Sequence, residues 1–469
     1  MRRKCQRVLF WLITLLIFLI IFSLVAVPPT IAIERISEVW KRDIGDNIQS
    51  IAVSDGKVFI LTFHGDLYSL NQNNGQTLWN YSLGGYAEYG WDSLLRVVNG
   101  RVLVGSSGSK LTTLDENTGE LLWEFQPSYF TTSFAMKAPP TFTVADGKVF
   151  TTGDGFYAVN ATDGKLIWES IDPNRFRGSW VVANNRVLME SIGDPPTYDR
   201  YLNSLNADDG KLLWTYKLFT SLESSPVVAD GRVLVWNRRQ NQTMLCLNET
   251  SGSLLWKCDV GAEAFQPTVA NGLVLFGASD GNFYALNESD GKLKWKYPTG
   301  YQSSLGYLGF AVARTTFDQV FVGYTVSSQG PQNEIEYQGY VSSINLVSGQ
   351  LNWSTPISNN AASFSSFVAI SLTFVNRTVY VTAFSDLYSI DVDSGKVQWV
   401  QNFDYWVIPP IYAYDKLFVA ADLKVIAYGE AEPSNQTLWN MLIAIGVIAA
   451  VVIVITVYWL SRKHAKSLI

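Results

Sequence analysis

The sequence predicts an all-β fold, a closed β-propeller built from four-stranded blades. A tryptophan recurs along almost the whole chain, with Gly four residues before it and Asn or Asp eight residues before it. A second hairpin signal, usually Asp-Gly or Asn-Gly, precedes each of these units. The two ends of the repeated region hold complementary parts of one further unit. Repetition of this kind indicates a propeller, a solenoid or an array.

The repeat is clearest at Phe283–Trp295, FYALNESDGKLKW. Its first segment is rich in β-forming residues, and its second segment alternates in polarity. Between them, Asn287 can hydrogen-bond its own backbone and Gly291 can adopt the positive φ that closes a turn. The preceding stretch, Pro226–Val235, has Asp-Gly between two apolar runs, which is the strongest short-range hairpin signal. Two hairpins make a four-stranded sheet whose apolar faces must stack on neighbouring sheets.

One large aromatic residue per unit is suited to packing between neighbouring sheets. We therefore interpret the repeated tryptophans as structural core residues and not as a ligand site. They are Trp40, Trp79, Trp123, Trp168, Trp214, Trp256, Trp295, Trp353 and Trp399.

Both elements of the repeat occur nine times, so we count nine units. The upstream turns lie near Asp55, Asn99, Asp146, Asn184, Asp230, Asn271, Thr316, Asn376 and Asp415. Glu38–Ile44 resembles the Trp-bearing strand of a unit that lacks its earlier strands, and Pro410–Tyr428 holds three strands without a Trp strand. We expect the N-terminal strand to complete the last blade, because closing the ring removes free sheet edges.

Two stretches depart from the repeat. The turn around Arg314–Asp318 lacks Gly, and we predict that it is longer than the corresponding turns of the other units. Ser327–Tyr337, SSQGPQNEIEY, reads as a polar loop between two strands. Such a loop is either a functional element or a passive surface insertion, and both interpretations stay open.

The termini predict a membrane protein. We divide the chain into a signal peptide or signal-anchor (1–33), the propeller ectodomain (34–429), a linker (430–437), a transmembrane helix (438–460) and a basic cytoplasmic tail (461–469). Val8–Val27 and Leu438–Leu460 are long, nearly uncharged apolar runs. Because basic residues flank both runs, we expect the propeller on the extracytoplasmic side of the cell membrane. Cleavage of the N-terminal segment stays open.

The sequence has eight Asn-X-Ser/Thr sequons for N-glycosylation, which are consistent with a propeller outside the cell. The candidate glycosylation sites are Asn80, Asn160, Asn241, Asn248, Asn287, Asn352, Asn376 and Asn435.

Composition and cysteine usage limit the function classes. The 469 residues carry a formal net charge of −6, with basic residues gathered at the two ends. An acidic body argues against nucleic acid as a partner. A regular hairpin register places Cys246 opposite Leu255, about 10 Å along the strand from Cys258. We therefore expect both thiols to be unpaired.

The unit A-x-[ND]-x-x-x-G-x-x-x-W, following P-x-V-x-[DN]-G-x-V, resembles the repeat of pyrroloquinoline-quinone-type (PQQ-like) β-propellers. The resemblance covers about Ile36 to Gly429 and is specific for the fold. The family includes quinoprotein dehydrogenases and the assembly lipoprotein BamB, and its well-known members have eight blades. The count of nine departs from that pattern, so eight blades with one degenerate unit stays an alternative.

The search for chemistry favours a binding protein. The adjacent cysteine pair of the dehydrogenases is missing, and their calcium and catalytic carboxylates cannot be matched to positions here. The only histidines are His64, which reads as a surface residue, and His464. We predict no catalytic residue, no metal site and no cofactor, and we expect a membrane-anchored scaffold for protein or glycan partners. The alternative is a membrane-bound PQQ-dependent dehydrogenase, with PQQ and calcium, acting on an alcohol or a sugar.

Overall fold

The computed structural model describes residues 36–430, apart from 85–94, 107–109, 128–141, 154, 171–175, 194–197, 221, 223, 238–241, 301–308, 317, 330–334, 358–369 and 405. Residues Val39–Ala427 form one compact unit, and the fold is described for this unit by itself. The apolar runs Val8–Val27 and Leu438–Leu460 lie outside the described residues. Within the described part of the chain, no helix has the length and apolar character needed to cross a membrane.

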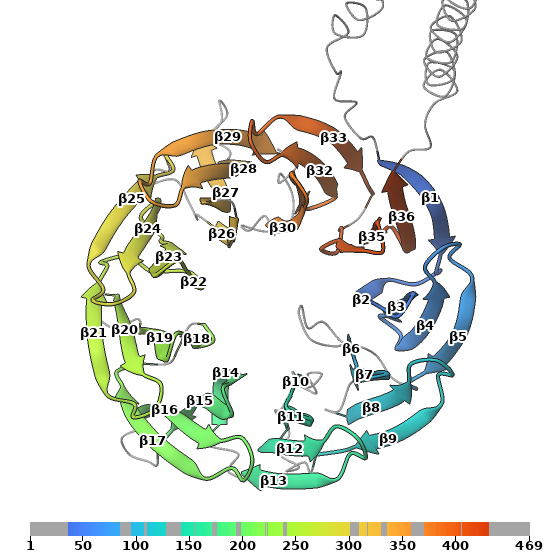
Figure 1. Ribbon diagram of the computed structural model, residues 1–469, viewed down its shortest axis with the longest axis horizontal. Coiled ribbons are helices and arrows are strands. Elements are labelled where there is room, and N and C mark those ends of the chain that lie inside the picture. Colours follow the sequence, from blue (N-terminus) through green and yellow to red (C-terminus); the bar gives the residue numbers. More distant parts are fainter. Residues whose placement is uncertain are drawn as a thin grey trace, which may run out of the picture. The chain divides into compact units, whose positions relative to one another are not determined.

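The described strands form nine sheets of four strands each, arranged around a ring (Figure 1). We name the sheets blades 1 to 9 and the strands of each blade a to d, from the centre of the ring outward. Within blades 1 to 8 the strands follow one another in the chain and pair antiparallel. The prediction of a nine-bladed propeller is thus confirmed, and the eight-bladed alternative is wrong.

The strands of each blade are given in the order a to d. Blades 1 to 3 are β2 (Ile48–Ser54), β3 (Lys57–Thr62), β4 (Asp66–Asn71) and β5 (Thr77–Ser82); β6 (Leu95–Val98), β7 (Arg101–Ser106), β8 (Lys110–Asp115) and β9 (Leu121–Phe125); β10 (Phe142–Ala145), β11 (Lys148–Thr152), β12 (Phe156–Asn160) and β13 (Leu166–Ser170). Blades 4 to 6 are β14 (Phe176–Ala183), β15 (Arg186–Ile192), β16 (Arg200–Asn206) and β17 (Leu212–Leu218); β18 (Val227–Ala229), β19 (Arg232–Asn237), β20 (Thr243–Asn248) and β21 (Leu254–Asp259); β22 (Thr268–Ala270), β23 (Leu273–Gly277), β24 (Asn282–Asn287) and β25 (Leu293–Pro298). Blades 7 to 9 are β26 (Gly309–Thr316), β27 (Gln319–Gln329), β28 (Ile335–Asn345) and β29 (Leu351–Ile357); β30 (Ile370–Val375), β31 (Thr378–Ala383), β32 (Asp386–Asp391) and β33 (Val397–Asn402); β34 (Ile411–Ala413), β35 (Lys416–Ala421), β36 (Lys424–Glu430) and β1 (Ile36–Asp43).

Blade 9 closes the ring with strands from both ends of the repeated region. Its order is β34–β35–β36–β1, so the N-terminal strand supplies strand d. The backbone N–H of Ile44 donates to the carbonyl of Leu423 at 2.9 Å, at the end of this strand pair. Trp40 and Phe418 of blade 9 pack in one core cluster with Ile60 of blade 1. The predicted closure by the N-terminal strand is therefore confirmed.

The hydrophobic core lies between blades. Each cluster of buried residues joins one sheet to the next; one of them combines Trp236 and Cys246 of blade 5 with Phe276 and Leu286 of blade 6. Because every blade buries both of its faces in this way, the inner three strands are apolar on both sides. A single blade could not be stable without its two neighbours.

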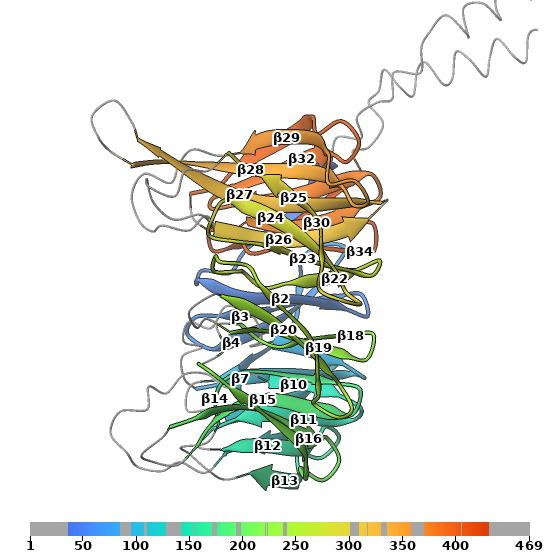
Figure 2. The ribbon, with the colours of Figure 1, turned by 90° about the vertical axis from the view of Figure 1, so that its left-hand side faces the viewer.

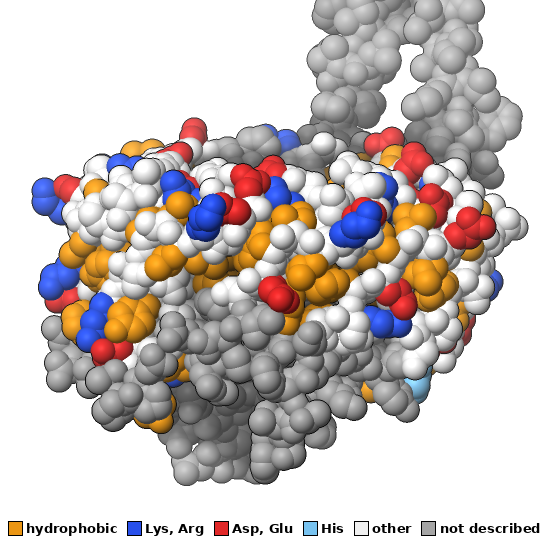
Figure 3. All heavy atoms as spheres, turned by 90° about the horizontal axis from the view of Figure 1, so that it is seen from below, with side chains coloured by type: hydrophobic (Ala, Val, Ile, Leu, Met, Phe, Trp, Pro, Cys, Tyr) orange, Lys and Arg blue, Asp and Glu red, His pale blue; other side chains and the backbone are white. Residues whose placement is uncertain are grey.

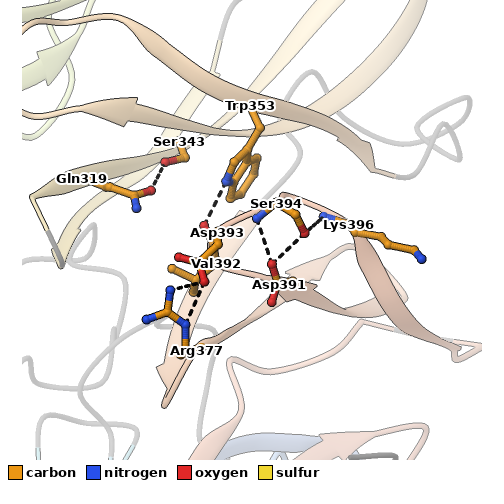
Figure 4. Close-up of polar contacts among 9 residues, drawn as sticks. All are labelled: Gln319, Ser343, Trp353, Arg377, Asp391, Val392, Asp393, Ser394 and Lys396. Carbon is orange, nitrogen blue, oxygen red and sulfur yellow. Dashed lines mark hydrogen bonds and ion pairs between the residues drawn. The ribbon is translucent and has the colours of Figure 1, made fainter. Parts of the chain in front are cut away.

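The repeated tryptophans fasten each blade to the next one. Trp353 of blade 7 donates its indole N–H to the carbonyl of Val392 in blade 8 at 2.9 Å (Figure 4). The same bond, always to the residue seven positions before the next Trp, measures 2.8 to 3.3 Å for eight tryptophans. The donors are Trp40, Trp79, Trp123, Trp168, Trp214, Trp256, Trp295 and Trp353. Trp399 of β33 is half-buried.

The spacing of the repeat follows from this contact. In blade 8, the Asp391 carboxylate accepts the backbone N–H of Ser394 at 2.8 Å and shapes the turn (Figure 4). Gly395 closes the turn with φ +68°, and a Cβ at this position would lie 2.4 Å from Trp353 Cδ2. Glycine is therefore needed twice, for the left-handed backbone and for the approach of the indole ring.

A β-bulge just before each of the eight tryptophans of blades 1 to 8 corrects the predicted register. Cys246 pairs with Trp256, while its neighbour Leu247 pairs with Leu254, so Leu255 has no partner of its own. The expectation that Cys246 faces Leu255 was wrong by this one residue. Both cysteines are free, as predicted, because Cys258 pairs with Met244 instead.

The turn between strands a and b of blade 7 also differs from the expectation. Thr316 pairs directly with Gln319, so the connection is the same length as in the other blades. Asp318 supplies the positive φ, +58°, that Gly supplies in blades 1, 2, 3, 5 and 6. A missing Gly had been read as a longer turn, whereas Asp tolerates the same backbone conformation.

A pair of Gly→Ala substitutions in blade 5 separates the two roles of glycine. Gly231 and Gly252 have nearly equal φ, +73° and +69°, but only at Gly252 would a Cβ meet the indole, 2.5 Å from Trp214 Cδ2. We expect Gly231→Ala to lower the free energy of unfolding by about 1–2 kcal/mol, the cost of left-handed backbone. Gly252→Ala should cost about 1–3 kcal/mol more, because the Trp is displaced. Chemical denaturation of both variants checks this, and equal losses would contradict it.

Candidate functional site: the loop face

The two faces of the ring differ in regularity. All nine connections between strands a and b have two residues, and all eight between strands c and d in blades 1 to 8 have five. We call the face that carries these turns the turn face. The opposite face, the loop face, carries the connections from b to c and from d to the next blade. These range from two residues (384–385) to sixteen (126–141).

A long hairpin marks blade 7 on the loop face. Strands β27 and β28 have 11 residues each and stay paired from Gln319↔Asn345 to Gln329↔Ile335. Figure 2 shows this hairpin extending beyond the neighbouring blades. The expected loop Ser327–Tyr337 is thus mostly paired β-structure, with Ser327 opposite Tyr337. The insertion was visible in the sequence, but its strand structure was not. Its residues are mostly polar and lack the alternation of apolar and polar residues that predicts a strand.

A buried charged group organises the loop face of blade 4. The Glu190 side chain is 1% exposed, and its Oε1 accepts a hydrogen bond from Arg200 Nη1 at 3.0 Å. Its Oε2 accepts the backbone N–H of Leu222 at 3.1 Å, in the connection to blade 5. Leu222 also bridges to Asn237. Glu190 therefore ties this connection to the sheet that it leaves.

A second polar group lies beside it in the same blade. Asn203 donates from Nδ2 to Ser191 Oγ at 2.6 Å and accepts from Thr215 Oγ1 at 2.8 Å. Asn203 is buried, so its amide is fixed in orientation by these two bonds. The loop-side half of blade 4 is thus held in part by polar contacts.

Hydroxyl groups form a further buried chain between blades 6 and 7. The Tyr324 hydroxyl lies 3.1 Å from Ser342 Oγ, which donates to Ser354 Oγ at 2.8 Å. Burial, followed by the neighbouring Tyr324, raises the pKa of Tyr297 to about 12. The Tyr297 hydroxyl therefore stays protonated at physiological pH, and the hydroxyl chain acts as a structural network.

His64 lies on the loop face of blade 1, in the connection between β3 and β4. Its side chain is 60% exposed, and Nδ1 lies 2.8 Å from Asp46 Oδ1. Burial alone would raise the pKa of Asp46, but hydrogen bonds from the backbone N–H of His64 and the Thr62 hydroxyl outweigh it and lower that pKa. The pair joins the connection that follows β1 to blade 1.

The side chains in the described part of the chain do not assemble a metal site. Among the described residues, no group of three or more His, Cys, Asp and Glu side chains lies close enough to share a metal ion. Burial raises the pKa of the Cys246 thiol to about 12, so it stays protonated. No step of PQQ-dependent chemistry can be assigned to this donor set.

The candidate glycosylation sites fall into three groups. Asn80, Asn352 and Asn376 are exposed. Asn160, Asn248 and Asn287 are half-buried at the turn face; in two of them Oδ1 accepts a backbone N–H, from Thr162 at 2.7 Å and from Thr250 at 3.0 Å. Asn241 and Asn435 lie outside the described residues.

Comparison with known proteins decides the family. The family profile PQQ_2, described as outer membrane protein assembly factor BamB, matches residues 31–135, 130–218 and 198–440. The chain belongs to this family of PQQ-repeat propellers. No protein in the curated collection matches it in sequence.

Solved structures similar to this PQQ-repeat propeller share its fold only. The computationally designed Ika8 protein is 12% identical, with a TM-score of 0.50, covering 84% of this chain and 99% of that one. BamB from Moraxella catarrhalis is 14% identical, with a TM-score of 0.47, covering 84% and 100%. The quinohemoprotein alcohol dehydrogenase ADHIIG from Pseudomonas putida HK5 is 12% identical, with a TM-score of 0.47, covering 84% and 76%.

Removing the buried carboxylate should loosen the loop face of blade 4. Glu190→Ala leaves the Arg200 guanidinium without its partner, which we expect to cost about 3 kcal/mol in free energy of unfolding. The value is at the lower end for buried pairs because Arg200 is 31% exposed. Amide hydrogen exchange at Leu222 should accelerate at the same time.

The exposed pair of Glu124 and Lys110, 2.6 Å apart, offers the control. Glu124→Ala should change the free energy of unfolding by no more than about 1 kcal/mol. Equal effects of the two substitutions would show that Glu190 does not organise the loop face.

Proposed function

We propose that this PQQ-repeat propeller is a non-enzymatic binding module, held at the cell membrane with its propeller outside and its C-terminal tail in the cytoplasm. Its loop face contacts the protein or glycan partner. The observation that carries the proposal is the contrast between the faces: connections of fixed length on the turn face and of varied length on the loop face. Binding residues commonly sit on variable loops that a rigid scaffold positions.

The course of the chain supports the choice of the loop face. Trp40, the fifth of the eight residues of β1, donates to Gln72 in a turn-face connection, whereas the bond from Ile44, directly after β1, to Leu423 lies at the loop-face end of the strand pair. Within the compact unit, the chain therefore enters through β1 and leaves through β36 at the turn face. The loop face carries neither attachment and stays available to a partner.

The family match supports a binding role without naming the partner. BamB is described as an outer membrane protein assembly factor, which is a scaffolding role. The apolar runs Val8–Val27 and Leu438–Leu460 with their basic flanks support the membrane anchor.

Shortening the blade 7 hairpin tests the binding role. Replacing 326–338 by the Phe384-Ser385 connection of blade 8 should preserve the fold, because β27 and β28 remain paired below the cut. Capture of partners by the purified full-length chain should fall at least about tenfold if the hairpin supplies a contact worth about 1.4 kcal/mol.

The matched control exchanges the turn-face connection 346–350 of blade 7 for the equal-length 392–396 of blade 8. Capture should be unchanged in this variant. If both variants capture the same partners as the parent, the loop face of blade 7 is not the binding site. Reduction of a dye with added PQQ, calcium and an alcohol or sugar would overturn the non-enzymatic proposal.

Protease added to intact cells tests the location separately. The propeller should be degraded, while an epitope tag placed after Ile469 should survive until the membrane is dissolved. Loss of the tag from intact cells, with the propeller preserved, would reverse the proposed orientation.

A further inference from the structure

The outer circumference of the ring carries unequal apolar surface. The β-bulge before each Trp turns two neighbouring side chains of strand d outward. In blades 2 to 5 both of these are large aliphatic residues that are 41–60% exposed; they are Leu121, Leu122, Leu166, Ile167, Leu212, Leu213, Leu254 and Leu255. In blades 1, 6 and 7, one of the two positions is Thr77, Lys294 or Asn352. Figure 3 shows the resulting band of hydrophobic side chains on the side of the ring at the bottom of Figure 1.

Charge along the same strands changes sign at blade 4. The residue directly after the Trp is exposed in all five blades from 2 to 6. In order, these residues are Glu124, Glu169, Thr215, Lys257 and Lys296. Acidic residues thus precede blade 4, basic residues follow it, and the middle position is neutral.

This order is self-complementary. When two copies lie side by side about a twofold axis parallel to the ring axis, with β17 against β17, each blade before blade 4 faces the blade equally far after it in the other copy. Glu169 then faces Lys257, whereas Glu124 and Lys296 lie two blades from the axis, where the rims of the two copies curve apart. A charge at position 215 would face its own copy near the axis, and Thr215 avoids that repulsion. The aliphatic band lies at the same height in both copies, so its central part is covered.

We propose that the protein forms a symmetric homodimer through the circumference of blade 4. Leu212 is 60% exposed and Phe219, just beyond β17, is 67% exposed, so the centre of the interface is strongly apolar. In the part of the chain that the structure describes, Glu169 and Lys257 have no ion-pair partner. The interface does not depend on the membrane anchor or on the loop-face site.

Other charges close to the interface are already paired within the chain. Lys217 of β17 lies 2.8 Å from Asp199, and Glu124 lies 2.6 Å from Lys110. The Glu169–Lys257 contact therefore carries most of the electrostatic complementarity.

A cysteine near the proposed axis gives a direct test in the full-length chain, in native membranes or detergent. Thr215→Cys should form a disulfide-linked dimer under mild oxidation, because the residue meets its own copy. Val400→Cys is the matched control, since Val400 is the exposed residue directly after the Trp in blade 8. It should give no more dimer than the parent chain, whose native cysteines set the background.

Charge reversal provides an independent test by sedimentation of the full-length chain. Glu169→Lys alone and Lys257→Glu alone should each weaken dimerisation by about tenfold, because attraction is replaced by repulsion. The double variant restores opposite charges and should recover the parent affinity, which a purely structural role would not predict.

Three outcomes would overturn the proposal. One is a Thr215→Cys chain that cross-links no more than Val400→Cys, together with a monomeric parent. The second is a dimer whose affinity ignores both single reversals, which would place the contact on another surface. Third, if Leu213→Asp leaves the chain monomeric like its parent but removes a captured protein, blade 4 binds a different partner and the dimer is wrong.

Discussion

The contact between each indole ring and the turn of the following blade is the interaction on which the ring depends. At each of these contacts, the indole N–H donates a hydrogen bond, the indole ring packs closely on the turn glycine, and that glycine has a positive φ. Gly252 illustrates this, because its positive φ closes the turn and its missing side chain admits Trp214, whose N–H reaches the carbonyl of Glu249 at 2.8 Å. Since blades 1 to 7 each both give and receive such a contact, the stability of each of these sheets is coupled to its neighbours.

This coupling explains why the two faces differ. The Trp contact reaches only the turns between strands c and d, and those turns pack on the two-residue turns between strands a and b. Glu249 donates its backbone N–H to the carbonyl of Gly231 at 3.0 Å, linking the two kinds of turn. Insertions there would break the joint between blades. The loop face carries no such constraint, so its connections vary in length, and blade 7 can extend a hairpin from it.

On the loop face, connections are fixed by contacts of single residues and not by contacts that recur in every blade. Glu190 occupies the fifth position of strand b, where the other blades have neutral residues such as Leu61, Gly277 and Thr382. A charge at a position inside a repeated strand was a signal that sequence comparison among blades could have found. Its partners could not be found in this way: Arg200 is the first residue of β16, and Leu222 lies in a connection whose length differs among the blades.

The sequence by itself determined the β-propeller class, the nine units, the turn residues and the closure by Glu38–Ile44, because these depend on local backbone chemistry and on counting. Only the tertiary structure decided the bulge beside Trp256, the pairing of Ser327–Gln329 with Ile335–Tyr337, and the blade that receives each Trp. The physical reason is that a bulge and a docking contact are selected by what the adjacent sheet presents. A single strand encodes its tendency to pair, but the neighbouring blade fixes its register and its exposed face.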